Sequence, residues 1–340
     1  MTHRVKFTFC LILMVFLWLL NLSLGSLSIP VVSLLERLVG IPFPRESWEI
    51  IVMEYRIPKS FTAVLAGIGL SVSGLQMQTF FRNPLAGPFV LGISSGAGLG
   101  VALLSMAGTA FGWQILSGTP NYWAAIIASS AGAIGVLVLM GLAAWKVKDS
   151  MTLLIVGLMF GSAASSIVTL LSYFSSAEEL KMFTLWSMGN LGNTGWPELG
   201  MLSGAIFIGL SLVIFSVKSY NAMLLGEAYA KSMGINFQKL QWIMIVSTGI
   251  LTGGITAFCG PIAFIGIAVP HLARLLFKTN DHRVLFPATA LLGILVLLAC
   301  DTLSQLPGYA SSLPINAVTT AFGAPLIIWL IMKRNFSEAF

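Results

Sequence analysis

The sequence predicts an all-α polytopic membrane protein with ten transmembrane helices, and three observations lead to this fold class. Hydrophobic residues make up 57% of the 340 residues and charged residues only 9%, and the mean hydropathy is +0.92. Soluble domains carry about 25% charged residues. Uncharged apolar runs recur along the chain, and the basic residues concentrate in alternate connecting segments. A chain with so few charges cannot cover a water-exposed surface, which excludes a soluble enzyme and a nucleic-acid-binding protein.

A helix needs about 20 apolar residues to cross the hydrocarbon core of a bilayer. Ten runs approach this length, at residues 7–29, 60–81, 89–107, 122–145, 151–174, 197–217, 240–259, 262–277, 284–304 and 313–332. The first run resembles the apolar core of a secretory signal that would end at the small residues 23–26. Because the run is long and more spans follow, we expect an uncleaved first helix. The eighth run is short and carries Pro270, His271 and Arg274 at its end, but without it every later loop would change sides.

The orientation follows from the distribution of basic residues. Ten spans place both termini on one side, and cytoplasmic loops of membrane proteins carry an excess of Lys and Arg. With both termini in the cytoplasm, only five of the 18 basic residues lie outside, namely Arg37, Arg45, Arg56, Lys59 and Lys181. We therefore expect a multi-pass protein with both termini cytoplasmic, and a single transmembrane domain over residues 1–340.

Three connecting segments are long enough to fold. The longest inner segment, residues 219–239, predicts two short amphipathic helices broken at Gly234. An ordinary interfacial helix is the alternative for this segment. Outside, residues 33–59 and 175–196 are long, and the second is expected to hold a re-entrant or short helix.

Glycines repeat at four-residue spacing in three of the spans. Small residues at this spacing let helices approach closely in lipid. The repeats are Gly92, Gly96 and Gly100, then Gly157 and Gly161, then Gly249 and Gly253. They serve either packing within the chain or a subunit interface that moves. The strings AGPFVLGI (86–93) and CGPIAFIGI (259–267) suggest an inverted repeat that relates spans two to five with spans seven to ten.

Ionisable residues are nearly absent from the spans, which bears on the mechanism. Glu198, His271, Arg274 and Asp301 lie near span ends, whereas a proton- or sodium-coupled carrier normally needs buried ionisable groups. A stand-alone secondary carrier or channel is therefore the alternative to ATP-driven transport. The string GISSG (92–96) matches a nucleophile elbow, but its glycines already have a packing explanation. The cysteines are too scattered for a disulfide framework or a thiolate metal site, so we expect no catalytic residue and no metal ligand.

The sequence contains no G-x-x-x-x-G-K-[ST], so it has no P-loop for ATP phosphates. If ATP drives transport, a separate ATPase must hydrolyse it. The inner segment YNAMLLGEAYAKSMGIN (220–236) offers such a partner a docking surface.

Several motifs together resemble permeases of the FecCD/BtuC type, the membrane subunits of type II ABC importers for iron–siderophores, haem and cobalamin. They are RIPKSFTAVLAGIGLSVSGLQMQTFFRNPLAGPFVLGISSGAGLG (56–100), W-S-M-G-N-L (186–191), G-E-x-x-A-x-x-M-G (226–234), GPIAFIGIAVPHLARLLFKTNDHRVLFPATALLG (260–293) and LPINAVTTAFGAPLIIWL (313–330). The similarity runs over nearly the whole chain.

The resemblance implies a permease of the bacterial inner membrane, working as a homodimer or close heterodimer with a translocation path between the subunits. Two ATPase subunits, which bind ATP and Mg, would attach from the cytoplasm, and a substrate-binding protein from outside. The chain itself would bind no cofactor. The cargo would be a metal chelate, with a ferric siderophore ranked before haem and cobalamin, carried by alternating access.

The resemblance also assigns roles to residues of this chain. Gly226, Glu227, Ala230, Met233 and Gly234 match the segment that couples to the ATPase. Asn83, Leu85, Ser150 and Met151 match the cytoplasmic gate. Arg56 and Lys59 match cations that dock the binding protein, although cations flanking a span also snorkel to the interface.

Two positions depart from the family pattern. Four residues after Asp301 the family often has a second docking arginine, and here Gln305 stands in its place, which puts the electrostatic match to a binding protein in doubt. Met233 replaces a more usual leucine. Helix position alone suggests that Ser165, Ser166, Thr169 and Tyr173 line the path, and a packed core is the alternative for them.

Overall fold

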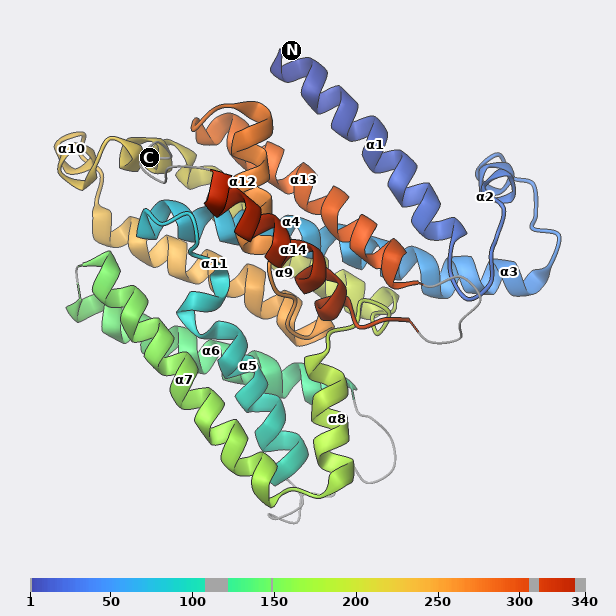
Figure 1. The fold of residues 1–340 in the computed structure, drawn as a ribbon, viewed down its shortest axis with the longest axis horizontal. Coiled ribbons are helices and arrows are strands. Elements are labelled where there is room, and N and C mark those ends of the chain that lie inside the picture. The colour runs from blue at the N-terminus through green and yellow to red at the C-terminus, as the bar shows by residue number, and fades with distance from the viewer. Residues whose placement is uncertain (1, 108–121, 148, 306–311, 334–340) are drawn as a thin grey trace.

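The computed structural model describes residues 2–107, 122–147, 149–305 and 312–333, and all regular structure in this part of the chain is helical (Figure 1). The longer helices are α1 (His3–Ser23), α4 (Ile57–Phe81), α6 (Tyr122–Lys146), α7 (Ser150–Phe174), α9 (Trp196–Leu224), α11 (Phe237–Cys259), α12 (Ile265–Phe277), α13 (His282–Ser304) and α14 (Ile315–Lys333). The shorter ones are α2 (Val31–Leu38), α3 (Glu46–Ile50), α5 (Ile93–Ala102), α8 (Ala177–Ser187) and α10 (Glu227–Ser232). A 3-10 turn, η2 (Pro88–Leu91), and two π-helical turns, η1 (Ile51–Arg56) and η3 (Leu103–Ala107), complete the described elements.

Each of the ten apolar runs coincides with a helix. Among the described residues, seven helices are long and apolar enough to cross a membrane, and three more are apolar but shorter, at Ile93–Met106, Ile265–Phe277 and Ile315–Trp329. The predicted all-α membrane fold is confirmed, and the count of ten crossings stays a prediction.

The second span begins earlier than the sequence predicts, because α3, η1 and α4 form one continuous helix from Glu46 to Phe81. The π-helical turn η1 ends immediately before the residue pair Ile57–Pro58. Proline has no N–H to donate to an α-helical ladder. A π turn at that place lets the chain pass the proline without ending the helix.

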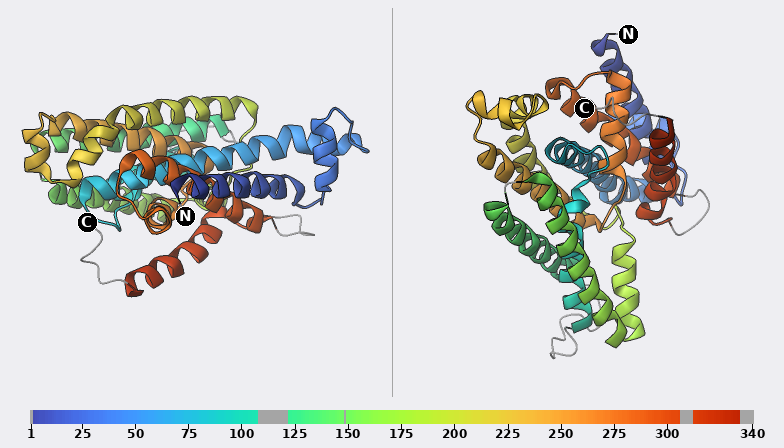
Figure 2. Two further views of the ribbon diagram at one scale, coloured as in Figure 1. Left: turned by 90° about the horizontal axis from the view of Figure 1, so that it is seen from above. Right: turned by 60° about the vertical axis from the view of Figure 1, so that its left-hand side comes forward.

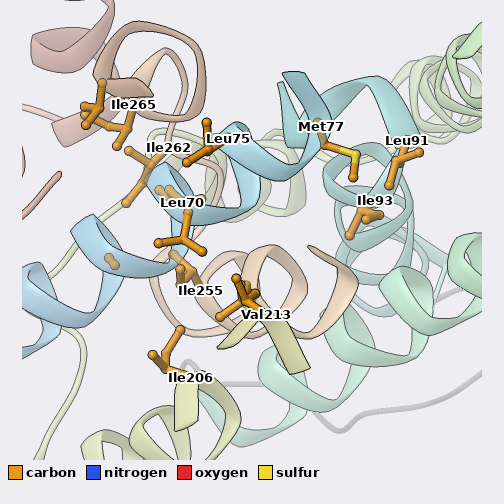
Figure 3. Close-up of a cluster of buried hydrophobic side chains, with 14 of the residues drawn as sticks. Leu70, Leu75, Met77, Leu91, Ile93, Ile206, Val213, Ile255, Ile262 and Ile265 are labelled. Carbon is orange, nitrogen blue, oxygen red and sulfur yellow. The ribbon is translucent and has the colours of Figure 1, made fainter. Parts of the chain in front are cut away.

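Helix α4 forms the centre of the bundle and is largely buried, with α9, α11, α12 and α13 packed around it. Close approach depends on glycines. A Cβ at Gly74 would lie 1.8 Å from the carbonyl oxygen of Gly266, and one at Gly67 would lie 2.6 Å from that of Gly293. Beside these contacts, Leu70 and Leu75 lie in a buried cluster with side chains from neighbouring helices (Figure 3). Backbone-to-backbone contact therefore positions α12 and α13 against α4.

The second group of helices, α5, α6 and α7, is also packed through glycines. A Cβ at Gly100 would lie 1.9 Å from the carbonyl oxygen of Ala128, and one at Gly132 would lie 2.0 Å from that of Gly96. Gly92, with φ +72, lies against the backbone of α7. The four-residue glycine repeats are thus explained by packing inside this chain, and they do not require a subunit interface.

The two proline-containing strings of the suggested repeat occupy equivalent joints. In both, a long helix (α4 or α11) ends at or before the string, and a short helix (α5 or α12) begins near its end. The glycines with positive φ stand at different places, Gly92 directly before α5 and Gly260 directly after α11. Helices α4 and α11 run in opposite directions through the bundle (Figure 1). Both features agree with an inverted repeat.

The two ends of the bundle differ. Helix α10 and the joints α4–α5 and α6–α7 lie at one end, which we call the coupling end, and α2 and α3 project from the opposite end (Figure 1). In the view from above, α14 extends away from the other helices (Figure 2). Residues 175–196 contain the expected short helix, α8, which begins with a capping box between Ser176 and Glu179.

The inner segment 219–239 differs from the prediction of two short helices. Residues up to Leu224 continue α9, only α10 stands free, and α11 starts at Phe237. The chain turns twice, at Gly226 and at Gly234, both with positive φ. The sequence interpretation missed the first turn because Gly226 lies inside an otherwise helical pattern.

Candidate functional site

The coupling segment, defined as residues 225–236 between α9 and α11, takes its shape from two glycines. Gly226 has φ +106 and ψ 153, in a region that is essentially restricted to glycine. Gly234 has φ +80, which glycine also adopts most readily. The N–H of Gly226 donates to the carbonyl of Met223 at 3.1 Å, and its carbonyl accepts the N–H of Ala230 at 2.9 Å. The segment is therefore an ordered elbow that is continuous with α9.

The coupling segment presents large side chains to the outside of the molecule. Ala230 is fully buried and anchors the elbow, whereas Leu225, Tyr229 and Met233 are all more than half exposed. The side chain of Glu227 lies outside the described part of the structure. Exposed apolar groups gathered on one projection are typical of a protein contact. Sequence reasoning missed Leu225 and Tyr229, although large apolar residues in a polar inner segment could have indicated them.

The first half of the predicted gate is the turn after α4. Arg82 adopts a left-handed conformation with φ 47 and ends the helix. The side-chain oxygen of Asn83 accepts the N–H of Leu85 at 2.9 Å, and the Asn83 carbonyl accepts the N–H of Ala86 at 3.0 Å. This compact turn leaves the Leu85 side chain exposed.

The second half of the predicted gate is the start of α7, at the same end of the bundle (Figure 1). Asp149 caps this helix, with its Oδ2 accepting the N–H and the hydroxyl of Thr152, each at 2.7 Å. These hydrogen bonds, the hydroxyl's first, lower the pKa of the Asp149 carboxyl below its ordinary value. Met151 is exposed, and the side chain of Ser150 lies outside the described part. A gating role for these residues stays a prediction.

The predicted path residues share one uncovered face of α7. Ser165, Ser166, Thr169 and Tyr173 are all exposed, so they do not belong to a packed core of this chain. The hydroxyl of Ser166 donates to the carbonyl of Ser162, and that of Thr169 donates to the carbonyl of Ser165, both at 2.9 Å. Because two of the four hydroxyls donate inside the helix, the face is mildly polar, and it carries no charged side chain among these residues.

At the opposite end of the bundle, the predicted docking residue Arg56 is buried, and its guanidinium forms hydrogen bonds within the chain. Its guanidinium donates to the carbonyls of Leu22 at 2.6 Å, Ser23 at 3.0 Å and Leu27. These carbonyls belong to the end of α1 and the turn that follows. A cation is favourable at the C-terminus of a helix, so Arg56 caps α1. Its docking role, which sequence resemblance predicted, is not tested by this geometry.

Lys59 lies in a polar cluster that joins α1, α4 and α13. Its Nζ is 3.0 Å from Oδ1 of Asp301, a carboxylate that is only 2% exposed. Oδ2 of Asp301 accepts the side-chain amides of Asn21 and Gln305, each at 2.8 Å. Gln305, where the family often has an arginine, therefore completes the shell around Asp301. Lys59 is an internal ion-pair partner as well as a predicted docking cation.

Comparison with known proteins agrees with this geometry. A model of the FecCD transport family matches residues 13–333. The vitamin B12 import system permease protein BtuC of Salmonella arizonae is 33% identical over 319 residues, which covers 93% of this chain and 94% of the relative. The protein of the same name from Salmonella typhimurium is 33% identical over 327 residues, covering 93% and 95%.

Two solved structures are also similar. An inward-facing conformation of a metal-chelate type ABC transporter gives a TM-score of 0.84 at 26% identity, covering 97% of this chain and 99% of the other. PsaBC from Streptococcus pneumoniae, in complex with Fab, gives a TM-score of 0.51 at 15% identity over 82% and 95%, and shows similarity of fold alone.

Proposed function

The chain belongs to the FecCD transport family, and from this premise we propose that it imports a metal chelate as the permease subunit of an ABC transporter. In the proposed mechanism two copies of the chain form the path across the bacterial inner membrane. ATP bound and hydrolysed on two separate ATPase subunits switches the path between its inward-open and outward-open states.

The observation that carries the proposal is the coupling segment. It projects from the coupling end, two glycines hold its shape, and it exposes Tyr229 and Met233. An elbow with an ordered backbone transmits a displacement better than a flexible loop does. A flexible loop would lose conformational entropy when the ATPase binds, whereas this segment is already ordered. The ATPase would receive these side chains in a groove, and Mg and ATP would bind to that partner.

The proposed path runs along the uncovered face of α7, at the interface with a second permease subunit. A large chelate has to enter and leave, so a wall with strong binding groups would retain it. The face with Ser165, Ser166 and Thr169 has no charge, and the hydroxyls of Ser166 and Thr169 donate to carbonyls within the helix. Such a wall fits a wide, weakly binding passage, and the inward-facing structural relative supports the alternating access of that passage.

The proposed topology has ten crossings with both termini in the cytoplasm. Helix α1 begins beside the end of α12, where Nζ of Lys6 donates to the carbonyl of Leu276 at 2.7 Å. After α12 the chain enters α13, and the first residues of α13 contact the last turns of α9, which lead into α10. The N-terminus therefore lies at the coupling end, as a cytoplasmic N-terminus requires.

The cargo we propose is a metal chelate. A ferric siderophore is the first candidate on the family resemblance, while the curated relatives described above are vitamin B12 permeases. The uncharged wall of α7 offers no group that would select one chelate, so selectivity would reside in an extracytoplasmic binding protein. Uptake assays with a ferric siderophore, haem and cobalamin, each with its binding protein, identify the cargo directly.

Reconstituted vesicles test the mechanism. The chain with its ATPase and binding protein should accumulate chelate only when ATP is present. Uptake by the chain alone under an ion gradient would instead establish the alternative, a secondary carrier or channel.

Substitutions in the coupling segment test the proposed contact. Glu227→Lys or Gly234→Arg should abolish stimulated ATPase activity while the purified permease keeps its melting temperature. Full stimulated activity in both variants would show that the ATPase does not engage this segment.

A further inference from the structure

A cluster of hydrogen-bonded polar side chains lies between the coupling segment and the gate turn at Asn83 and Leu85. It is buried at three of its members and reaches solvent at the others. Neither the sequence motifs nor the family assignment gives it a role. We call it the junction cluster, and it consists of Thr79, Tyr220, Asn221, Asp281 and His282. Thr79 belongs to the end of α4, Tyr220 and Asn221 to the last turns of α9, and Asp281 and His282 to the start of α13.

Asn221 joins α9 to α13 through both ends of its side-chain amide. Its Nδ2 donates to Oδ1 of Asp281 at 2.7 Å. Its Oδ1 accepts the backbone N–H of His282 at 2.8 Å and lies 2.9 Å from Nδ1 of the same residue. Because the amide nitrogen already donates to Asp281, Oδ1 is the acceptor, so Nδ1 of His282 carries a proton.

His282 continues the connection to α4. The other ring nitrogen, Nε2, lies 2.9 Å from the hydroxyl oxygen of Thr79, and that hydroxyl also lies 2.9 Å from the carbonyl oxygen of Leu75 within α4. The His282 ring is 1% exposed, and the rings of Tyr220 and Phe286 lie 5.7 Å and 5.3 Å from it. A buried ring held on both nitrogens and between aromatic neighbours has one orientation.

Tyr220 ties the same turn of α9 to α4 a second time. Its hydroxyl accepts the side-chain amide of Gln76 at 2.6 Å, and that amide also donates to Ser247 of α11 at 2.6 Å. Separating α9 from α4 would leave these buried groups without partners, which is unfavourable. The ends of α4, α9 and α13 therefore prefer to move together.

The positions of the cluster along the chain give this connection its meaning. Asn221 lies five residues before Gly226, where the ordered elbow begins, and Thr79 lies four residues before Asn83, where the gate turn begins. Helical backbone covers most of both intervals, since α9 ends at Leu224 and α4 ends at Phe81. A displacement of α10 thus has a short, hydrogen-bonded route to the turn at Asn83 and Leu85.

We propose that Asn221, His282 and Thr79 are positioning residues that carry movement of the coupling segment into the gate turn. The inference rests on the proposed function, since it needs an ATPase that moves α10. It adds a transmission route that involves neither the ATPase contact nor the path itself.

The test uses the permease–ATPase complex in lipid nanodiscs. A water-soluble maleimide reports the gate turn by labelling the thiol introduced by Leu85→Cys, with and without Mg-ATP. The native cysteines Cys10, Cys259 and Cys300 are buried and contribute little background. In the otherwise native complex the labelling rate should change when nucleotide is added. The readout is the ratio of the faster to the slower of the two labelling rates, with and without Mg-ATP. Asn221→Ala should reduce that ratio about five-fold or more, the range of an allosteric coupling.

A matched control and a rescue separate positioning from general stability. Asn316 is the control, because its side-chain oxygen also accepts a backbone N–H, from Ala263 before α12, at 3.1 Å. It lies outside the junction cluster, so Asn316→Ala should leave the ratio unchanged. Asn221→Asp places two carboxylates in contact and should lose the response. The exchange Asn221→Asp with Asp281→Asn restores a donor–acceptor pair and should recover it.

Thr79→Val, which keeps the shape of the side chain and removes its hydroxyl, decides the question if Asn221→Ala does not assemble. An undiminished response in Thr79→Val, or in Asn221→Asp, would overturn the proposal. So would a native complex that imports chelate without any change at Leu85, because the turn would then not be the gate. Loss of ATP-dependent import in the native complex would instead overturn the proposed function, and the inference with it.

Discussion

Substitution of Lys59 by methionine distinguishes an internal role of this lysine from its predicted docking role. The change keeps an unbranched side chain that is one atom shorter, and it removes the charge. Asp301 is then left as a carboxylate that is 2% exposed, with two neutral donors at 2.8 Å on Oδ2 and no cation at 3.0 Å from Oδ1. Removing one partner of a buried ion pair costs about 3–5 kcal/mol.

The structure favours the lower end of that range. Lys59 keeps 18% of its side chain exposed, so water partly screens the pair, and Asn21 and Gln305 still stabilise the carboxylate. We expect a loss of about 3 kcal/mol, which corresponds to a fall of about 6 °C in melting temperature at about 2 °C per kcal/mol for a large chain. The double variant Lys59→Met with Asp301→Asn removes the isolated charge and should recover about half of the loss.

A thiol-reactive dye measures this melting in detergent, because Cys10, Cys259 and Cys300 are buried in the folded protein. Binding-protein affinity is measured on the same samples. A loss of about 0.5 kcal/mol in the free energy of unfolding would lower the melting temperature by about 1 °C. If Lys59→Met melts within about 1 °C of the native protein, the ion pair therefore does not stabilise the fold. Weaker binding without a change in melting would make Lys59 a docking cation.

Three further changes test the packing, the coupling segment and a helix cap. Gly132→Ala should destabilise the fold by about 2 kcal/mol or more, because the added Cβ would lie 2.0 Å from the carbonyl oxygen of Gly96. The control Gly135→Ala on the same helix meets nothing within 4 Å and should leave the melting temperature unchanged. Equal melting curves for the two variants would contradict the glycine packing. Gly226→Ala should reduce ATP-driven uptake with little change in melting, because the strain of about 1–3 kcal/mol falls on the exposed coupling segment, and full uptake would show that glycine is not required there. The pKa of Asp149 is lowered in the folded protein, so Asp149 stabilises the fold above a pH of about 4, and this stabilisation is lost as the pH falls below that value. Asp149→Asn should remove this part of the acid dependence of the melting temperature. Parallel curves of melting temperature against pH for the variant and the native protein would refute the cap.

The coupling segment shows how far sequence reasoning reaches at the candidate site. The motif places Gly226, Ala230 and Gly234 in one inner segment, and the structure places that segment as a projecting elbow. The number of helices in it was predicted wrongly, because a helical hydrophobic pattern does not reveal a turn at Gly226 whose φ is +106. Glycine can adopt both negative and positive φ, so the packing of the folded chain, and not the local sequence pattern, decides which one it takes.

Arg56 and Lys59 show the opposite case. Their positions beside the second span suggest exposed cations, and nothing in the neighbouring sequence says otherwise. The structure instead pairs Arg56 with carbonyls of α1 and Lys59 with Asp301 of α13. These partners come from distant parts of the chain, so local pattern could not identify them.

The sequence by itself determined that this is a helical membrane protein, approximately where its helices lie and which family it resembles. Hydropathy and charge act residue by residue against lipid and water, and so they can be read along the chain. Only the tertiary structure decided which glycines touch, which cations are occupied and how the junction cluster joins three helix ends. Those contacts connect residues as far apart as Asn21 and Asp301, 280 positions along the chain, and they exist only once the helices have packed.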